Sequence, residues 1–170
     1  STGGRRPILI ELNAKAGFAV GIDVGSPRMA DPKIVLLITD LRGQVVHRVV
    51  RSRTLESMDR VLQGLGEAIR ELFKTSPIDV KQIRGIGVGL PGILDERAGT
   101  IRETSRQSVR TNYEVVRDQL EAALGLPILM GTEVALAGYG ELRFGLGRPV
   151  SNLVYLHSDI GASCILNGAI

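Results

Sequence analysis

The order of short apolar runs and helical segments constrains the fold more than any other feature of the sequence. Three apolar runs come first, over residues 18–24, 34–39 and 44–53. The second and third are separated only by the turn Asp40-Leu41-Arg42-Gly43, and strands joined by so short a turn pair antiparallel. We therefore expect three antiparallel strands at the start of the domain.

Helices and further strands then alternate. Apolar side chains recur at three- and four-residue steps from about residue 57 to 74, which predicts an amphipathic helix. The elements expected after it are a glycine-rich strand over 83–90, a helix over 113–124, a strand over 127–130 and a helix over 133–144. This order predicts an α/β domain with a mixed five-stranded sheet flanked by helices.

The remaining segments are predicted to be less regular. Residues 95–110 show little periodicity and predict a long loop. Residues 153–157 predict a strand, residues 163–166 begin another, and Asn167-Gly168 is typical of a hairpin turn. Residues 1–7 are rich in Gly, Arg and small polar side chains, which is typical of a linker, so we expect another domain to precede them.

The composition is that of an ordinary globular domain. Hydrophobic residues make up 44% of the 170 residues, aromatic residues make up 4% and Trp is absent, so the core must be aliphatic. The net charge of +3 is too small to indicate a nucleic-acid-binding face by itself. Arginines cluster within residues 42–53 and 97–110; we interpret both clusters as solvated surfaces, with a phosphate or acidic-partner site as the alternative.

The single cysteine, Cys164, excludes a disulfide or a cysteine-based zinc site within this chain. Its apolar neighbours predict a small core residue rather than a nucleophile. No apolar stretch is long enough to span a membrane and no signal peptide is visible. We therefore expect a cytoplasmic protein without a membrane partner.

Four short motifs follow one another along nearly the whole chain: GIDVG at 21–25, GVGLPGILD at 87–95, GLPI at 125–128 and NLVYL at 152–156. In this order and spacing they resemble the ROK family (repressor, open reading frame, kinase) of sugar kinases and transcriptional regulators. The resemblance implies a ribonuclease H-like or actin-like ATPase lobe.

The resemblance also implies a division of the chain. Residues 1–16 would be a linker from a missing N-terminal DNA-binding domain, residues 17–157 the first lobe, and residues 158–170 the start of a truncated second lobe. Within these limits we expect no cofactor and no metal. The structural zinc site of the family would lie in the second lobe.

One departure from the kinase pattern concerns the catalytic base. The resemblance implies that Glu133 takes the position of the aspartate that deprotonates the sugar hydroxyl in kinase relatives. Its extra methylene moves the carboxylate by about 1 Å, and a displacement of that size can cost on the order of 100-fold in rate. Alternatively, Glu133 only places a favourable negative charge at the start of a helix.

Further departures fall in the two turns that hold nucleotide phosphates in kinase relatives. Asp159 puts a negative charge where the family has a glycine, and Pro27 removes a backbone N–H. The resemblance makes the following residues relics of those turns: Asp23, Gly25, Ser158, Asp159 and Gly161. For Asp23 a role in capping its own turn is equally compatible with the sequence.

The sugar-facing positions implied by the resemblance lie at three places in the chain. They are Pro91, Gly92, Ser105, Arg106, Thr132 and Glu133. In the family this loop carries an Asn that binds sugar hydroxyls, whereas here it reads Ser105-Arg106-Gln107-Ser108. The positive charge of Arg106 raises the possibility of a phosphorylated or acidic ligand. His157 ends the predicted strand 153–157, at the second of the turns that hold phosphate in kinase relatives. We favour a structural role for it over ligand contact.

The hypothesis that these features favour is the effector-sensing lobe of a transcriptional repressor. A sugar or sugar phosphate would bind it, and DNA would be reached only through the missing N-terminal domain of a homo-oligomer. The main alternative is an ATP-dependent, glucokinase-like sugar kinase of the same family. A lobe that only dimerises, and a metal nuclease using Asp23 and Glu133, are weaker alternatives.

Overall fold

A computed structural model describes residues 10–26, 29–53, 57–102, 110–157 and 161–169 of the chain. The strands are β1 (Phe18–Asp23), β2 (Lys33–Asp40), β3 (Val45–Ser52), β4 (Ile83–Leu90), β5 (Ile93–Asp95), β6 (Thr100–Arg102), β7 (Arg110–Asn112), β8 (Ile128–Thr132), β9 (Leu153–His157) and β10 (Gly161–Ile165). The helices are α1 (Met58–Thr75), α2 (Tyr113–Leu124) and α3 (Glu133–Phe144), with short 3-10 turns η1 (Ala14–Ala16) and η2 (Val80–Gln82).

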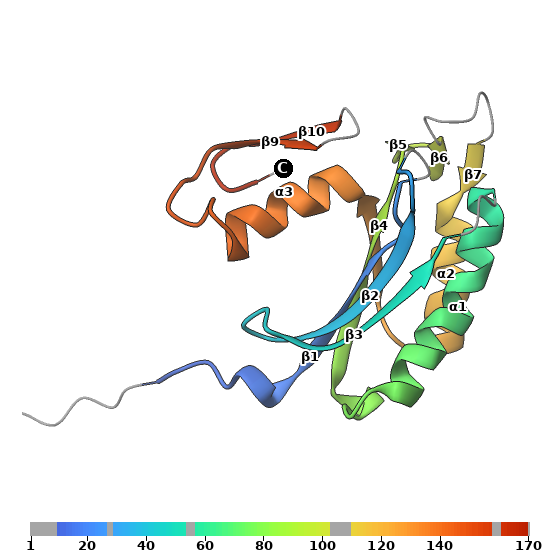
Figure 1. The fold of residues 1–170 in the computed structure, drawn as a ribbon, viewed down its shortest axis with the longest axis horizontal. Coiled ribbons are helices and arrows are strands. Elements are labelled where there is room, and N and C mark those ends of the chain that lie inside the picture. Colours follow the sequence, from blue (N-terminus) through green and yellow to red (C-terminus); the bar gives the residue numbers. More distant parts are fainter. Residues whose placement is uncertain (1–9, 27–28, 54–56, 103–109, 158–160, 170) are drawn as a thin grey trace, which may run out of the picture.

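The main sheet has five strands in the order β3-β2-β1-β4-β8 (Figure 1). β3, β2 and β1 pair antiparallel, whereas β1, β4 and β8 pair parallel. This confirms the predicted mixed sheet of an antiparallel meander followed by helix-connected strands. The parallel pairs require crossovers, and α1 and α2 supply them.

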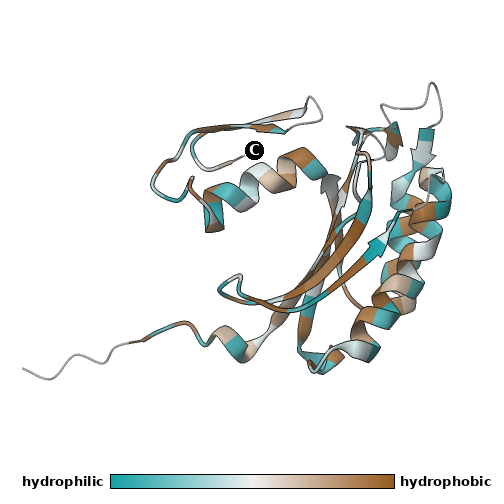
Figure 2. Ribbon diagram, in the orientation of Figure 1, coloured by the Kyte–Doolittle hydropathy of each residue, from teal (hydrophilic) through white to brown (hydrophobic). Residues whose placement is uncertain are grey.

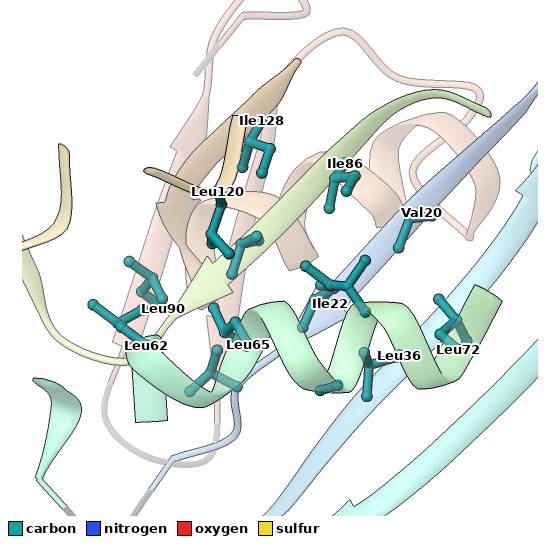
Figure 3. Close-up of a cluster of buried hydrophobic side chains, with 14 of the residues drawn as sticks. Val20, Ile22, Leu36, Leu62, Leu65, Leu72, Ile86, Leu90, Leu120 and Ile128 are labelled. Carbon is teal, nitrogen blue, oxygen red and sulfur yellow. The ribbon is translucent and has the colours of Figure 1, made fainter. Parts of the chain in front are cut away.

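One face of the sheet carries the hydrophobic core. Successive side chains of a strand point to opposite faces, and the alternate residues Val20, Ile22, Leu36 and Ile38 are all buried beneath α1. α1 presents an apolar stripe to this face, whose fully buried members include Leu62, Ile69 and Leu72. Figure 3 shows the labelled members of this set, Val20, Ile22, Leu36, Leu62 and Leu72, gathered between α1 and the sheet, and Figure 2 shows the polar side of α1 facing outward.

The opposite face of the sheet is much smoother, because glycines occupy its centre. Gly21 of β1 pairs with Gly87 of β4, and Asp23 pairs with Gly89. α3 lies on this face, and the β9–β10 hairpin packs on the far side of α3 (Figure 1). The small residues allow the N-terminus of α3 to approach the sheet closely: a Cβ on Gly89 would lie 3.4 Å from the Cα of Glu133.

Individual residues near the ends of α2 and in the last turn of the chain determine the local backbone conformation. Asn112 caps α2 by accepting a hydrogen bond from the backbone N–H of Val115 (3.1 Å), and Gly125 ends it in the left-handed conformation at φ +66°. Asn167 and Gly168 also have positive φ, and Leu166 pairs with Ala169 across them. The hairpin turn predicted at Asn167-Gly168 is therefore confirmed.

The prediction of a long loop over residues 95–110 is wrong in part. β5, β6 and β7 form a small antiparallel sheet, in which Ile101 of β6 and Thr111 of β7 are buried. Three-residue strands are too short to show periodicity in the sequence, and Gly99 makes the turn between two of them at φ +62°. Residues 103–109 lie outside the described part of the chain.

Cys164 is exposed, which contradicts the prediction of a small core residue. It lies on β10, which pairs antiparallel with β9 in a separate two-stranded sheet. On that strand the burial alternates, so Ser163 and Ile165 face α3 whereas Cys164 points away. The β9–β10 pairing also runs across the domain boundary expected at residue 157, and that boundary stays a prediction.

The asymmetry between the two faces gives a test of where the stability resides. We predict that Leu36→Ala, at a site with no exposed surface, lowers the free energy of unfolding by about 2–5 kcal/mol. Leu129→Ala is the matched control, since Leu129 lies in the same sheet but is 78% exposed; we expect a change below about 0.5 kcal/mol. Urea unfolding followed by circular dichroism measures both, and equal losses would contradict the assignment of the core.

Candidate functional site

A cavity of about 550 Å³ lies between the glycine-rich face of the sheet and α3. Its lining comes from β1 and the turn after it, from β2 and the residues before it, from β4, from the start of α3 and from the last residue of β9. The lining residues are Gly21, Ile22, Asp23, Gly25, Ser26, Met29, Asp31, Lys33, Val35, Leu37, Gly87, Gly89, Glu133, Leu136, Ala137 and His157. The cavity thus brings together three residues singled out from the sequence, Asp23, Gly25 and Glu133.

Asp23 is fixed at the end of β1 by its own turn. Its Oδ1 accepts a hydrogen bond from the backbone N–H of Gly25 at 2.9 Å, and the next residue, Val24, donates its N–H to the carbonyl of Gly89 at 3.1 Å. Gly25 has φ +73°, and a Cβ there would lie 2.1 Å from the carbonyl oxygen of Lys33. This geometry gives Asp23 the turn-capping role considered from the sequence, and leaves its carboxylate on the cavity wall.

The basic side chains beside this turn serve the fold. Arg53 is only 5% exposed and its Nη1 donates a hydrogen bond to the carbonyl of Gly25, so one member of the first arginine cluster is buried rather than solvated. Arg51 forms an ion pair with Glu71 of α1. On the cavity wall itself, the amine of Lys33 lies 2.8 Å from the carboxylate of Asp31.

Glu133 is the first residue of α3, where the helix dipole favours a negative charge. The hydroxyl of the preceding Thr132 accepts a hydrogen bond from the N–H of Ala135 at 3.3 Å and so caps the helix. Thr132, expected to face the sugar, is not among the residues that line the cavity. Glu133 lines it together with Leu136 and Ala137 from the next turn of the same helix.

The Pro91-Gly92 corner follows β4 but does not line this cavity. Pro91 is buried, and Gly92 adopts φ +141° with its Cα packed so that a Cβ would lie 2.6 Å from the carbonyl oxygen of Arg102. Both residues are absent from the cavity lining. Gly161 is also absent from it, and packs against Val134 in the first turn of α3.

Four of the predicted site residues cannot be placed in this geometry. Ser105, Arg106, Ser158 and Asp159 lie outside the described residues, as does Pro27. The part of the site that the structure describes is therefore the wall made by β1, β2, β4 and α3.

Sequence reasoning gave too little weight to His157 and to the apolar wall of the cavity. His157 lines the cavity from the end of β9, and its Nδ1 is buried without a hydrogen-bond partner among the described residues. Met29, Val35 and Leu37 add apolar surface. The alternation along β2 was the available signal, because it puts Val35 and Leu37 on the face opposite the core residues Leu36 and Ile38.

The described residues show neither a metal-binding cluster nor a membrane-spanning helix. No group of three or more His, Cys, Asp or Glu side chains lies close enough together to ligate a metal ion. Among the helices of the same residues, none is both long enough and apolar enough to cross a bilayer.

The contribution of Asp23 to its turn can be measured by substitution. We predict that Asp23→Ala lowers the free energy of unfolding by about 1–2 kcal/mol, because the N–H of Gly25 loses a charged acceptor. Asp23→Asn keeps an acceptor oxygen and serves as the control, with a loss of less than about half as much. Thermal or urea unfolding measures both. Equal losses for the two variants would show that the charge, rather than the turn, is what matters for folding.

Comparison with known proteins gives a consistent result. The sequence pattern of the ROK family matches residues 19–170. The xylose repressor of Caldicellulosiruptor bescii is 30% identical over 162 residues, which cover 95% of this chain and 39% of the repressor. The chain therefore spans about two fifths of the length of this relative.

Solved structures of both regulators and kinases share the fold. A ROK family transcriptional regulator, a homolog of the E. coli MLC protein, matches with a TM-score of 0.74 at 21% identity, covering 92% of this chain and 38% of that one. A ROK hexokinase from Thermus thermophilus matches with a TM-score of 0.66 at 25% identity, covering 89% and 47%. The expected actin-like ATPase lobe is confirmed, and the chain belongs to the ROK family.

Proposed function

We propose that this chain is the effector-sensing lobe of a ROK-type transcriptional repressor and that its effector is a sugar. The observation that carries the proposal is the cavity between the sheet and α3, into which β1 brings Asp23 and α3 brings Glu133. Similarity to a xylose repressor over 95% of the chain supports a regulatory rather than an enzymatic role.

The chemistry of the cavity suits a carbohydrate. Carboxylates accept hydrogen bonds from hydroxyl groups, and apolar side chains such as Val35, Leu37 and Leu136 can pack against the C–H surface of a sugar ring. His157 lines the same cavity from the end of β9.

The charges on the cavity wall favour a neutral sugar over a sugar phosphate. Three carboxylates line the described cavity, those of Asp23, Asp31 and Glu133, against the single amine of Lys33, which Asp31 already neutralises. A phosphate dianion placed there would meet repulsion in a partly desolvated site. Arg106, which lies outside the described residues, would instead favour a sugar phosphate. The binding test below distinguishes the two ligands.

The second candidate is an ATP-dependent sugar kinase, favoured by the structural match to a ROK hexokinase. We consider this chain a degenerate kinase, because Glu133, Asp159 and Pro27 each depart from the residue types that phosphoryl transfer needs. An acidic side chain beside the phosphate site opposes nucleotide binding, and a proline removes a phosphate-binding N–H.

The remaining parts of the proposal concern the full-length protein. Residues 1–16 would link this lobe to an N-terminal DNA-binding domain, and residues 158–170 would begin a second lobe that carries the structural zinc site. The protein would act as a homo-oligomer. Sugar binding between the lobes would favour one arrangement of the attached DNA-binding domain over another, which requires only that the two arrangements differ in sugar affinity.

Calorimetry on the full-length protein tests the sugar site, with xylose, glucose and glucose 6-phosphate as probes. We predict saturable binding of a neutral sugar, weakened about 10-fold or more in Glu133→Ala because a charged hydrogen-bond acceptor is lost. Gly87→Val should weaken binding by narrowing the cavity, because Gly87 lines it and a Cβ there meets nothing closer than 3.9 Å. Gly64→Val on α1 is the control, and the proposal fails if no probe binds.

An ATP-consumption assay tests the kinase alternative. We predict no turnover above background with any of the three sugars as acceptor, because the base is displaced and the phosphate turns are altered. Turnover by the wild type that Glu133→Gln abolishes would establish a kinase instead.

A further inference from the structure

We infer that α3 couples the cavity to the N-terminal segment of the chain through the β2–β3 turn. This inference rests on the proposed function, because it describes how occupation of the sugar cavity would reach the side from which the chain enters the lobe. It depends on three consecutive sets of contacts: cavity to α3, α3 to the turn, and the turn to residues 11–14.

The first link is α3 itself, which spans the distance between the two ends of the route. Glu133 in its first turn lines the cavity, and Phe144 is its last residue. Twelve helical residues are about 18 Å long, and a hydrogen-bonded helix moves as a unit over that length. Leu136 and Ala137 also line the cavity, so a ligand would touch the helix over more than one turn.

The second link is a close contact between Phe144 and the turn. A Cβ on Gly43 would lie 2.5 Å from Cε1 of the Phe144 ring, so the ring packs directly on the glycine backbone. The turn is stiff, because the carboxylate of Asp40 accepts hydrogen bonds from the N–H groups of Arg42 and Gln44, each at 2.9 Å. A shift of the ring therefore displaces the turn as a body rather than bending it.

The third link joins the other side of the turn to the N-terminal segment. Leu41 donates its N–H to the carbonyl of Ala14 at 3.0 Å, and Nη2 of Arg42 donates to the carbonyl of Leu12 at 3.2 Å. The same guanidinium lies 3.6 Å from the carboxylate of Glu11. Figure 1 shows the β2–β3 turn between the C-terminal end of α3 and the N-terminal segment.

The exposure of these groups suits a coupling role better than a stabilising one. Phe144 is 60% exposed, and the pair Arg42–Glu11 lies at the surface. Exposed contacts of this kind add little to stability, so they can be made and broken as α3 moves.

Hydrogen exchange on the full-length protein tests the route, with xylose as the probe and Phe144→Ala as the variant. In the wild type we expect xylose to change exchange at least threefold both around the cavity and at the amides of residues 10–16 and 40–43. In Phe144→Ala the cavity should still respond, whereas the response of residues 10–16 should be lost. Leu146→Ala is the control, because Leu146 is 95% exposed. An unchanged response of residues 10–16 in Phe144→Ala would overturn the inference.

A second arm needs no ligand, so that failure of the sugar proposal leaves the coupling testable. Leu136→Trp puts bulk into the cavity and should displace α3, changing exchange at residues 10–16 at least threefold without sugar. Adding Phe144→Ala to it should restore the wild-type rate there. If xylose fails to bind but this arm behaves as expected, the effector proposal falls and the coupling stands; if residues 10–16 do not respond to Leu136→Trp, the coupling is refuted.

Discussion

The structure depends on the unequal packing of the two faces of one sheet. Along β1 and β4, large apolar residues alternate with smaller or polar ones, which are Ala19, Gly21 and Asp23 in β1 and Gly85, Gly87 and Gly89 in β4. The large residues form the face that packs against the helices, and the opposite face has little side-chain bulk at its centre. Ile22 pairs with Leu36 and Val88 on the covered face, and Asp23 pairs with Gly89 on the other. Burial of the aliphatic face supplies the hydrophobic stabilisation, and the glycine face supplies room for a ligand.

The cavity follows from this asymmetry together with the position of α3. Because Gly89 has no side chain, the helix N-terminus comes close enough to bring Glu133 to the same cavity as Asp23. Two carboxylates in one partly apolar cavity give a site whose acceptors suit hydroxyl groups. A ROK regulator and a ROK hexokinase of known structure share this fold.

α3 has a second consequence because it is held at both ends. Its first turn contacts the cavity, its middle packs tightly on the β9–β10 hairpin, where a Cβ on Gly138 would lie 2.1 Å from Oγ of Ser163, and its last residue contacts the β2–β3 turn. A helix packed in this way cannot absorb a displacement locally, so a ligand at one end has effects at the other. The glycines of the sheet and of α3 thus serve binding and coupling at once.

The sequence by itself determined the order of the elements in the five-stranded sheet and the helices that connect them, and its motifs indicated the family. The strands and helices follow from periodicity, which is a local property, whereas the family follows from the resemblance of four short motifs. It also identified Asp23 and Glu133 as candidates. Only the tertiary structure decided that these two share a cavity with His157, that Pro91 and Gly92 do not line it, that Arg53 is buried, and that Cys164 is exposed. Such facts depend on which strands become neighbours and which face α3 covers, and side-chain contacts between distant segments leave no mark in local sequence patterns.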